Sequence, residues 1–189
     1  MALLETPDGN IGWRAAPFKL KGTDGKVYTL NEVKGPKGLL VMFICNHCPY
    51  VKAVIDRVVQ DAKQLNAAGI GVVAIMSNDT KSYPDDSFEN MQEFAKERGF
   101  TFPYLLDETQ EVARAYGAVC TPDFFGFNSK LELQYRGRLD ESWNLTKPAP
   151  RRELLLAMKE IAEKGKTDIA QFPSMGCSIK WKEKKQAFG

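Results

Sequence analysis

The sequence is poor in several kinds of feature, and each shortage excludes a class of protein. Acidic and basic residues nearly cancel, with a formal net charge of +2, so no nucleic-acid partner is expected. Four cysteines in 189 residues are too few for a disulfide-rich scaffold. No apolar run is long enough for a membrane span, and no internal repeat or low-complexity tract is present. The composition, with 43% hydrophobic residues, is that of one ordinary globular domain.

The start of the chain lacks a recognisable targeting signal. Met1 to Asp8 have no basic flank and no apolar core of the kind that a secretory signal requires, so we expect a cytoplasmic protein. In a reducing compartment, closely spaced cysteines indicate redox or metal chemistry. Near the other end, a cluster of lysines is expected to be a solvated tail and not a surface for nucleic acid or membrane. These lysines are Lys180, Lys182, Lys184 and Lys185.

A C-x-x-C motif, Cys45 to Cys48, lies at a predicted junction between a strand and a helix. An apolar run at 39–44 precedes it, and apolar residues recur at helical spacing over 49–68. Unpaired N–H groups and the positive end of the helix dipole favour negative charge at such a junction, so a thiolate is stabilised there. His47, the single histidine of the chain, is placed to lower a thiol pKa further. We therefore predict catalytic roles for Cys45, Cys48 and His47.

Strands and helices are predicted to alternate after this motif. The run 70–76 has the β-branched enrichment of a buried parallel strand, which gives a strand, helix, strand unit with a right-handed crossover. Asn78 and Asp79 follow this strand at the edge where ligands bind, although a plain turn is the simpler interpretation. The other predicted elements are a hairpin over 18–30, a helix capped by Asp86 or Ser87 and ending near Arg98, a strand over 102–106, a helix capped by Asp107 and closed by Gly117, a hairpin over 124–136 and a helix over 151–164.

The order of these elements resembles the thioredoxin fold, in which a C-x-x-C strand-to-helix junction is followed by alternating strands and helices and a final hairpin and helix. The opening at Phe18 to Gly25 and the stretch Phe102 to Asp107 are similar to the peroxiredoxin-like branch, the alkyl hydroperoxide reductase and thiol-specific antioxidant family. The resemblance implies an α/β protein of thioredoxin-like fold, with a central mixed sheet flanked by helices and an N-terminal β-hairpin. We divide the chain into a domain over 1–165 and a C-terminal tail over 166–189.

The resemblance also implies roles for individual residues. Cys45 corresponds to the exposed attacking cysteine and Cys48 to the partly buried resolving one. Pro122 corresponds to the family's cis-proline, and Thr121 to the residue whose backbone pairs with a bound peptide. His47 occupies the place of a histidine in strongly oxidising disulfide oxidases, which favours a low pKa for Cys45. The implied activity is exchange with protein or small-molecule disulfides, using an external thiol reductant and no cofactor.

Departures from the family pattern keep other functions open. No carboxylate follows Cys48 within one helical turn to accept a proton. If the chain is a thiol peroxidase instead, Cys48 is the peroxidatic cysteine and Cys45 the resolving one, but Val41 and Cys45 then replace Pro and Thr of the P-x-x-x-T-x-x-C pattern. Arg136 and Arg138 are better described as exposed strand residues than as the peroxiredoxin arginine. A redox-inactive binding module is the third alternative.

Two further cysteines have open roles. Cys120 directly precedes the predicted cis-proline loop, so it is either a third redox cysteine or the last buried residue of a strand. Cys177 in the tail could resolve a sulfenate or mixed disulfide by folding over the site, although an inert thiol is the simpler interpretation. Structural zinc sites usually use two close ligand pairs, and only one such pair exists, so no metal is expected. The oligomeric state is not predicted.

Overall fold

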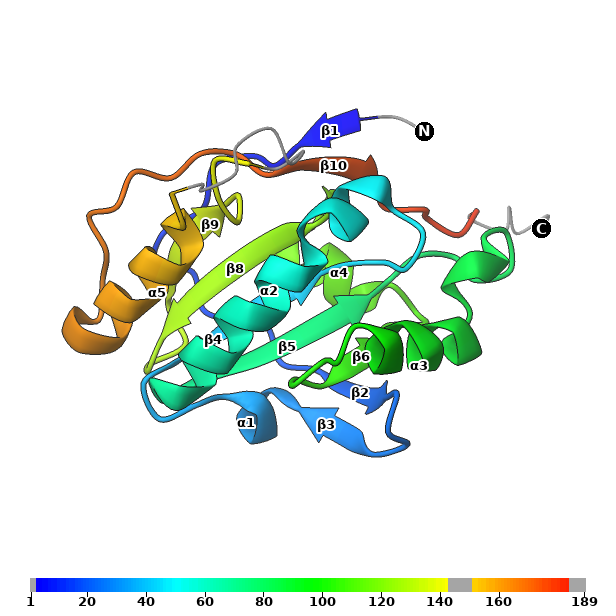
Figure 1. Cartoon of the computed structure of the whole chain (residues 1–189), viewed down its shortest axis with the longest axis horizontal. Coiled ribbons are helices and arrows are strands. Elements are labelled where there is room, and N and C mark those ends of the chain that lie inside the picture. Colours follow the sequence, from blue (N-terminus) through cyan, green and yellow to red (C-terminus); the bar gives the residue numbers. More distant parts are fainter. Residues whose placement is uncertain (1–2, 143–150, 184–189) are drawn as a thin grey trace, which may run out of the picture.

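The computed structural model of the protein describes residues 3–142 and 151–183. A central mixed sheet forms from two hydrogen-bonded sets of strands, β3-β2-β6-β5 and β4-β8-β9, which meet where β4 lies beside β5 (Figure 1). Just past the end of β4, the Ile44 backbone N–H donates to the Ile75 carbonyl at 3.0 Å. Only β5 and β6 are recorded as a parallel pair among these ladders, the others being antiparallel. The strands are β2 (Lys19–Gly22), β3 (Val27–Thr29), β4 (Gly38–Phe43), β5 (Ile70–Met76), β6 (Tyr104–Leu106), β8 (Asp123–Asn128) and β9 (Leu133–Gly137).

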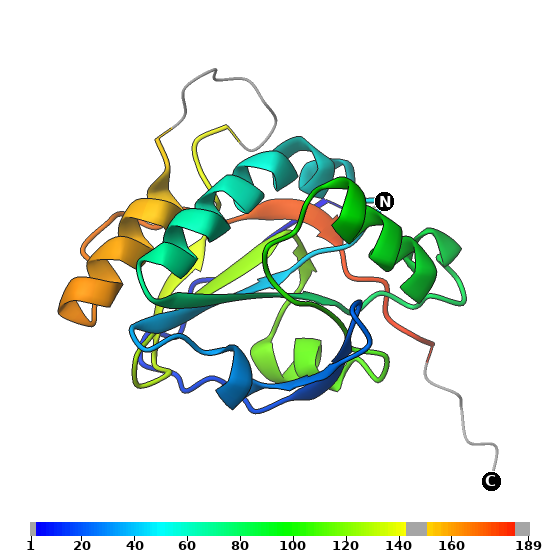
Figure 2. The same cartoon turned by 60° about the horizontal axis from the view of Figure 1, so that its bottom comes forward.

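Helices cover both faces of this sheet, as Figure 2 shows. One face carries α2 (Pro49–Ala67), α3 (Phe88–Glu97) and α5 (Glu153–Lys164), and the other carries α1 (Leu30–Val33) and α4 (Glu111–Tyr116). This is the α/β architecture predicted from the sequence, with the N-terminal hairpin in place. Within the described residues, no helix combines the length and the apolar character that crossing a membrane requires.

Strand β4 lies at the centre of two hydrophobic cores, one on each face. Leu40 and Met42 pack in the core beneath α2 and α5, whereas Leu39 and Val41 pack in the core beneath α1 and α4. Successive side chains of a strand point to opposite faces, so an unbroken apolar run is what a strand covered on both sides requires. Burial on both faces makes β4 a rigid support for the motif that follows it.

Helix α2 begins and ends where the sequence predicts. Cys48 is its N-cap and Pro49 its first residue, where the missing N–H of proline removes no helical hydrogen bond. Ala68 is the C-cap, and Gly69 follows with a φ of 85°, a left-handed conformation that glycine adopts without strain. The helix therefore starts at the second cysteine and directs its N–H groups toward it.

The remaining predicted elements are also present. Strand β5 has the predicted bounds, and Ser87 caps α3 by accepting the Asn90 N–H at 3.3 Å. Asp107 accepts the N–H groups of Val112 and Ala113 at 3.4 and 2.9 Å, so its carboxylate satisfies the start of α4 although Gln110 is the N-cap. A short 3-10 helix, η1 (Pro84–Asp86), precedes α3 and was not predicted.

The segment predicted to be a tail contributes a strand. β10 (Met175–Ser178) lies between β1 (Leu3–Glu5) and β7 (Cys120–Thr121) in a small antiparallel sheet. The sequence predicts no element over 166–189, because four residues without an alternating pattern carry no strand signal. Their pairing depends on partners far away in the chain. Strands from near the two ends of the chain thus pair beside the loop that contains Pro122.

The lysine cluster is not uniformly solvated. Lys180 is buried, its backbone N–H donates to Asn78 Oδ1 at 2.8 Å, and its ammonium group donates to the Ser178 carbonyl at 2.6 Å. The expectation of a solvated lysine is therefore wrong for Lys180, because the pairing of strand β10 holds the residues that follow it against the rest of the fold. Lys184 and Lys185 lie outside the described residues.

Substitution of Ile55 by alanine should destabilise the protein strongly. Ile55 is on the buried face of α2 with 0% exposure, so the change leaves a cavity and should lower the free energy of unfolding by about 2–5 kcal/mol. Urea denaturation provides the measurement. Gln60→Ala on the exposed face of the same helix is the matched control and should change it by less than about 0.5 kcal/mol. Equal effects of the two substitutions would contradict the packing described above.

Candidate active site

The two cysteines of the motif lie in the loop between β4 and α2, with both sulfurs reduced and buried. Cys45 is 1% exposed and Cys48 is 0% exposed. The expectation that Cys45 is an exposed cysteine is therefore wrong. Strand β4, before the motif, is covered on both faces. Both cysteines of the motif pack in the core beneath α2 and α5 and do not project into solvent.

The opposite wall of the site is the loop at Thr121 and Pro122. Their peptide bond is cis, as the resemblance implies. The Cys45 sulfur lies 3.3 Å from the Thr121 hydroxyl oxygen, and the Cys48 sulfur lies 3.2 Å from the Thr121 carbonyl oxygen, to which it donates when it is protonated. One residue of β7 therefore contacts both sulfurs. The backbone of Thr121, assigned by the resemblance to peptide pairing, is in register with Cys177 of the chain's own β10.

The pKa values of the two thiols are shifted in opposite directions. Hydrogen bonding with the Cys45 thiol lowers the pKa of Cys48 to about 5; burial opposes this shift, and hydrogen bonds with Cys177 and the Val51 N–H add to it. The hydrogen bond with Cys48 raises the pKa of Cys45 well above its usual value, together with burial and the charge of Asp86. The reduced pair therefore holds its negative charge on Cys48, not on Cys45 as expected from the position of His47.

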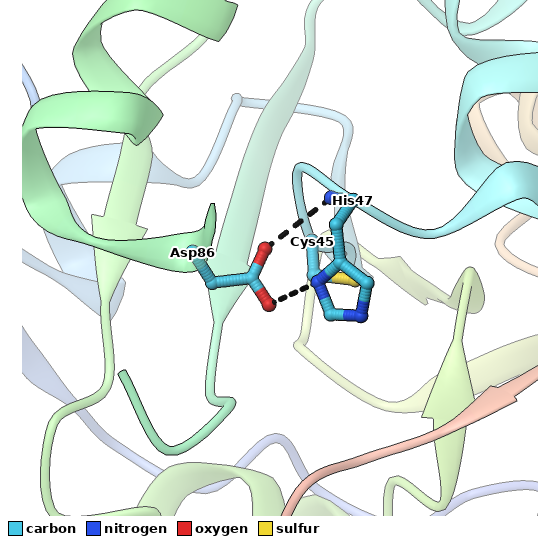
Figure 3. A group of neighbouring side chains, drawn as sticks. All are labelled: Cys45, His47 and Asp86. Atoms are coloured by element: carbon cyan, nitrogen blue, oxygen red, sulfur yellow. Dashed lines mark hydrogen bonds and ion pairs between the residues drawn. The ribbon is translucent and has the colours of Figure 1, made fainter. Parts of the chain in front are cut away.

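A buried carboxylate holds the middle of the motif, and the sequence did not reveal it. Asp86 Oδ2 lies 2.7 Å from His47 Nδ1, and Asp86 Oδ1 accepts the Asn46 backbone N–H at 2.8 Å (Figure 3). Asn78 donates its side-chain N–H to Asp86 Oδ2 at 2.7 Å. Asp86 is in η1 and fully buried, and three residues from two other segments contact its carboxylate. Asn78 thus contributes to the site.

The neighbours of these residues fix the loop further. Tyr104 donates its hydroxyl to Asn46 Oδ1 at 2.9 Å, so Asn46 is held at both its backbone and its side chain. Asp79, which the sequence placed at the same edge, uses its carboxylate for the turn that follows it, accepting from Lys81 and Ser82. The turn interpretation is therefore confirmed for Asp79.

His47 is oriented by its contact with Asp86. A carboxylate only accepts hydrogen bonds, so Nδ1 donates and the neutral ring leaves Nε2 as a proton acceptor. Nε2 is buried, with no hydrogen-bond partner among the described residues. The Tyr83 ring stacks on the imidazole with centroids 5.9 Å apart. This arrangement can take up or release a proton next to the motif.

A surface cavity of about 460 Å³ borders the motif on the side of His47. Neither cysteine sulfur lines it, so a substrate that enters there meets the imidazole first. Its lining is mostly polar and charged: Asn46, His47, Lys52, Asp85, Asn90, Glu93, Phe94, Glu97 and Arg98.

The two remaining cysteines differ in what surrounds them. Cys177 packs in the same core cluster as Cys45 and Cys48. Cys120 points its thiol toward the Pro122 carbonyl at 3.8 Å, and burial raises its pKa, so it stays protonated. The structure thus favours the buried-residue interpretation for Cys120 and brings Cys177 to the site.

The two arginines considered for a peroxidase are occupied elsewhere. Arg136 is buried and paired with Asp123 at 3.0 Å, which corrects the expectation that it is exposed. Arg138 pairs with Glu153 at 2.7 Å. Neither guanidinium has a recorded contact with a cysteine of the motif, among the residues described.

One group of side chains could hold a metal ion. Ligand atoms of Cys45, His47 and Asp86 lie within 4.8 Å of one another, and no other three such side chains come as close within the described ranges. The set offers three ligands, and the hydrogen bond between His47 Nδ1 and Asp86 would have to break for Nδ1 to bind metal.

Comparison with known proteins agrees with this fold. Residues 11–139 match the model of the AhpC/TSA family. The crystal structure of an uncharacterized conserved protein from Geobacillus kaustophilus has a TM-score of 0.91 at 45% identity and covers 97% of this chain and 98% of that chain. Thiol-disulfide oxidoreductase ResA from Bacillus subtilis (strain 168) is 28% identical over 144 residues, 72% of this chain and 76% of ResA. The thioredoxin domain of a thiol-disulfide oxidoreductase from Bacteroides vulgatus has a TM-score of 0.58 at 17% identity, covering 68% of this chain and 89% of that domain, so the fold is thioredoxin-like.

The reduced protein should show a thiolate that titrates near pH 5. Because the pKa of Cys48 is about 5, ultraviolet thiolate absorbance should rise across that pH and be complete near neutrality. Cys48→Ser should remove the transition, and Cys45→Ala should move it to higher pH, because the hydrogen bond with Cys45 is the largest cause of the lowered pKa. Cys120→Ser is the control and should leave it unchanged. A transition that persists in Cys48→Ser would place the charge on Cys45.

Substitution of Asp86 by asparagine should destabilise the loop that carries the motif. The change removes charge-assisted hydrogen bonds from buried donors and should lower the free energy of unfolding by about 1–3 kcal/mol, measured by urea denaturation. It should also lower the pKa of Cys45, because the charge of Asp86 raises it. Asp85→Asn, at the exposed neighbouring position, is the matched control. Equal stability of the two variants would argue against a structural role for the buried carboxylate.

Proposed function

This chain belongs to the AhpC/TSA family, and we propose that it is a thiol-disulfide oxidoreductase that uses the Cys45–Cys48 dithiol. The observation that carries the proposal is the pair of free thiols gathered against Thr121 at the N-terminus of α2. A dithiol so placed can close into a disulfide while it reduces another one. The name of the relative ResA, a thiol-disulfide oxidoreductase, supports the same activity.

In the proposed reaction, Cys48 thiolate attacks one sulfur of a substrate disulfide. A mixed disulfide forms on Cys48, and the other substrate sulfur leaves as a thiolate. Cys45 then loses its proton and attacks the Cys48 sulfur, forming the Cys45–Cys48 disulfide and releasing the second substrate thiol. Two electrons pass from the dithiol to the substrate, so an external thiol reductant must restore the enzyme.

The charge distribution supports this order of attack. The hydrogen bond with Cys48 is the largest cause of the raised pKa of Cys45. This interaction with a charged sulfur ends once Cys48 is part of a mixed disulfide. Cys45 is therefore easier to deprotonate at the step that needs it. The resemblance implies the opposite order, with Cys45 attacking first, and the two orders differ in which single-cysteine variant traps a substrate.

His47 is the proposed acceptor of the Cys45 proton. A ring nitrogen of His47 lies within 4.8 Å of the Cys45 sulfur, and Nε2 has no hydrogen-bond partner among the described residues. Asp86 acts as a positioning residue, since it holds Nδ1 and so directs the imidazole. This arrangement supplies the carboxylate-linked proton acceptor that the sequence did not provide within one turn after Cys48.

A thiol peroxidase is the second candidate, and the lowered pKa of Cys48 favours it. Cys48 thiolate would attack a peroxide oxygen, forming a sulfenic acid and releasing an alcohol or water, and Cys45 would condense with the sulfenic acid to give a disulfide and water. The buried sulfurs suit a small oxidant. The engagement of Arg136 and Arg138 with other carboxylates weighs against this reading.

Assays of disulfide reduction and of peroxide consumption should separate these functions. Wild type should reduce a small disulfide such as glutathione disulfide, and Cys48→Ser should abolish turnover because the thiolate is lost. Cys45→Ser combined with Cys177→Ser, which removes both thiols next to Cys48, should also abolish turnover and accumulate a mixed disulfide on Cys48, detectable by mass spectrometry. Cys120→Ser, which replaces a buried thiol outside the dithiol, is the matched control and should retain wild-type turnover.

Other results would decide against the proposal. Peroxide turnover that Cys48→Ser abolishes, with negligible disulfide exchange, favours the peroxidase. Activity in neither assay by a folded protein favours a redox-inactive binding module. A mixed disulfide trapped on Cys45 in Cys48→Ser would reverse the proposed order of attack and leave the activity itself standing.

A further inference from the structure

Strand β10 brings a third thiol to the dithiol. It lies beside β7 across the top of the molecule near the start of α2 (Figure 1), with Cys177 in register with Thr121 and Ser178 with Cys120. Thr121 is the residue that contacts both sulfurs of the motif. The register therefore places Cys177, from the far end of the chain, directly across from the residue on which the dithiol rests.

On both sides of Cys177 the chain is held tightly against the segment that contains Thr121 and Pro122. A Cβ atom on Gly176 would lie 1.9 Å from the Thr121 carbonyl oxygen, so this close approach requires glycine. Ser174 donates its hydroxyl to the Pro122 carbonyl at 2.7 Å, and the Ile179 N–H donates to the Val119 carbonyl at 3.0 Å. Cys177 itself is 3% exposed. Its position is thus set by backbone contacts at either end.

The sulfur of Cys177 interacts with the sulfur of Cys48. Hydrogen bonds from the Cys177 thiol and backbone N–H both act to lower the pKa of Cys48. Burial, then the hydrogen bond with Cys48, raises the pKa of Cys177 to about 12, so in the reduced protein it stays a thiol. Cys48 therefore lies between two thiols, Cys45 on its own loop and Cys177 on β10.

We propose that Cys177 is a third redox-active cysteine, which resolves intermediates on Cys48 by forming a Cys48–Cys177 disulfide. This rests on the proposed function for the supply of a mixed disulfide on Cys48. Cys177 gives up its proton and attacks the Cys48 sulfur, so that the Cys48–Cys177 bond forms and the bond to the substrate breaks. The substrate sulfur leaves with the bonding electron pair and takes up a proton. No further oxidant is needed.

The same exchange can act on the closed dithiol. Cys177 thiolate attacks Cys48 in the Cys45–Cys48 disulfide, Cys48–Cys177 forms, and Cys45 leaves as a thiolate that is then protonated. The number of disulfides is unchanged, so the step is an isomerisation. In the Cys45–Cys48 form the disulfide lies within the loop of the motif. In the Cys48–Cys177 form it joins the start of α2 to β10, and Cys45 is a free thiol. Cys48 is common to both because it is the central sulfur.

The test uses the full chain with Cys45→Ser, which leaves Cys177 as the neighbouring thiol of Cys48. The reduced variant is treated with glutathione disulfide, quenched with an alkylating reagent and mapped by peptide mass spectrometry. We expect a Cys48–Cys177 disulfide with Cys120 alkylated. Release of glutathione from Cys48 should be at least about tenfold faster than in Cys45→Ser/Cys177→Ser, because a thiol held beside the reacting sulfur has a high effective concentration.

Two further measurements test whether the Cys48–Cys177 bond forms. Cys45→Ser/Cys120→Ser is the matched control and should still form the Cys48–Cys177 bond. Wild type, equilibrated at graded ratios of glutathione to its disulfide, should contain both Cys45–Cys48 and Cys48–Cys177 species, which avoids dependence on the folding of any variant.

Failure of this inference and failure of the proposed function give different results. Glutathione that persists on Cys48 in Cys45→Ser with Cys177 alkylated, and wild type that forms only Cys45–Cys48, would overturn the role of Cys177 and leave the dithiol function standing. A bond from Cys48 to Cys120 would likewise overturn it. A Cys48–Cys177 bond in a protein that does not reduce disulfides would support the role of Cys177 and overturn the proposed function.

Discussion

A buried negative charge on Cys48 is the constraint on which the rest of this site depends. An uncompensated charge in a protein interior costs several kcal/mol, so a thiolate with no exposure needs donors on more than one side. Those donors are the Cys45 thiol, the Val51 N–H and Cys177. They belong to the loop after β4, the first turn of α2 and the strand β10. The thiolate therefore requires the central sheet, the helix start and the terminal strand at the same time.

After the hydrogen bond with Cys48 and burial, a second buried charge is a further reason why Cys48 and not Cys45 holds the first. Asp86 receives hydrogen bonds from the backbone of Asn46 and the side chains of His47 and Asn78, and its charge raises the pKa of Cys45. Two negative charges this near one another repel, so the dithiol places its charge on the sulfur farther along the motif, at the helix N-terminus. His47 lies beside Asp86, and its Nε2 has no hydrogen-bond partner in the part of the chain that the structure describes.

Local sequence signals predicted most of the scaffold. The apolar run of β4 and the helical spacing after Pro49 were confirmed, because the spacing of apolar residues along a segment reflects which of its side chains are buried. The position of Asp86 in the site was not foreseen, and that of Cys177 was foreseen only as the less simple of two alternatives. Asp86 looked like a helix cap, since Asp before a helix usually serves that purpose, and Cys177 stood in a segment without periodicity. Both reach the dithiol only through contacts between segments distant in sequence.

The sequence by itself determined the thioredoxin-like order of elements, the start of α2 at Cys48 and Pro49, and the pairing of two cysteines at a strand-to-helix junction. These follow from periodicity and capping chemistry, which act over a few neighbouring residues. Only the tertiary structure decided which sulfur carries the charge, that both are buried, and that Cys177 lies across from Thr121. Desolvation and electrostatic interaction depend on distance in space, so a pKa in this site is a property of the folded assembly and not of the motif.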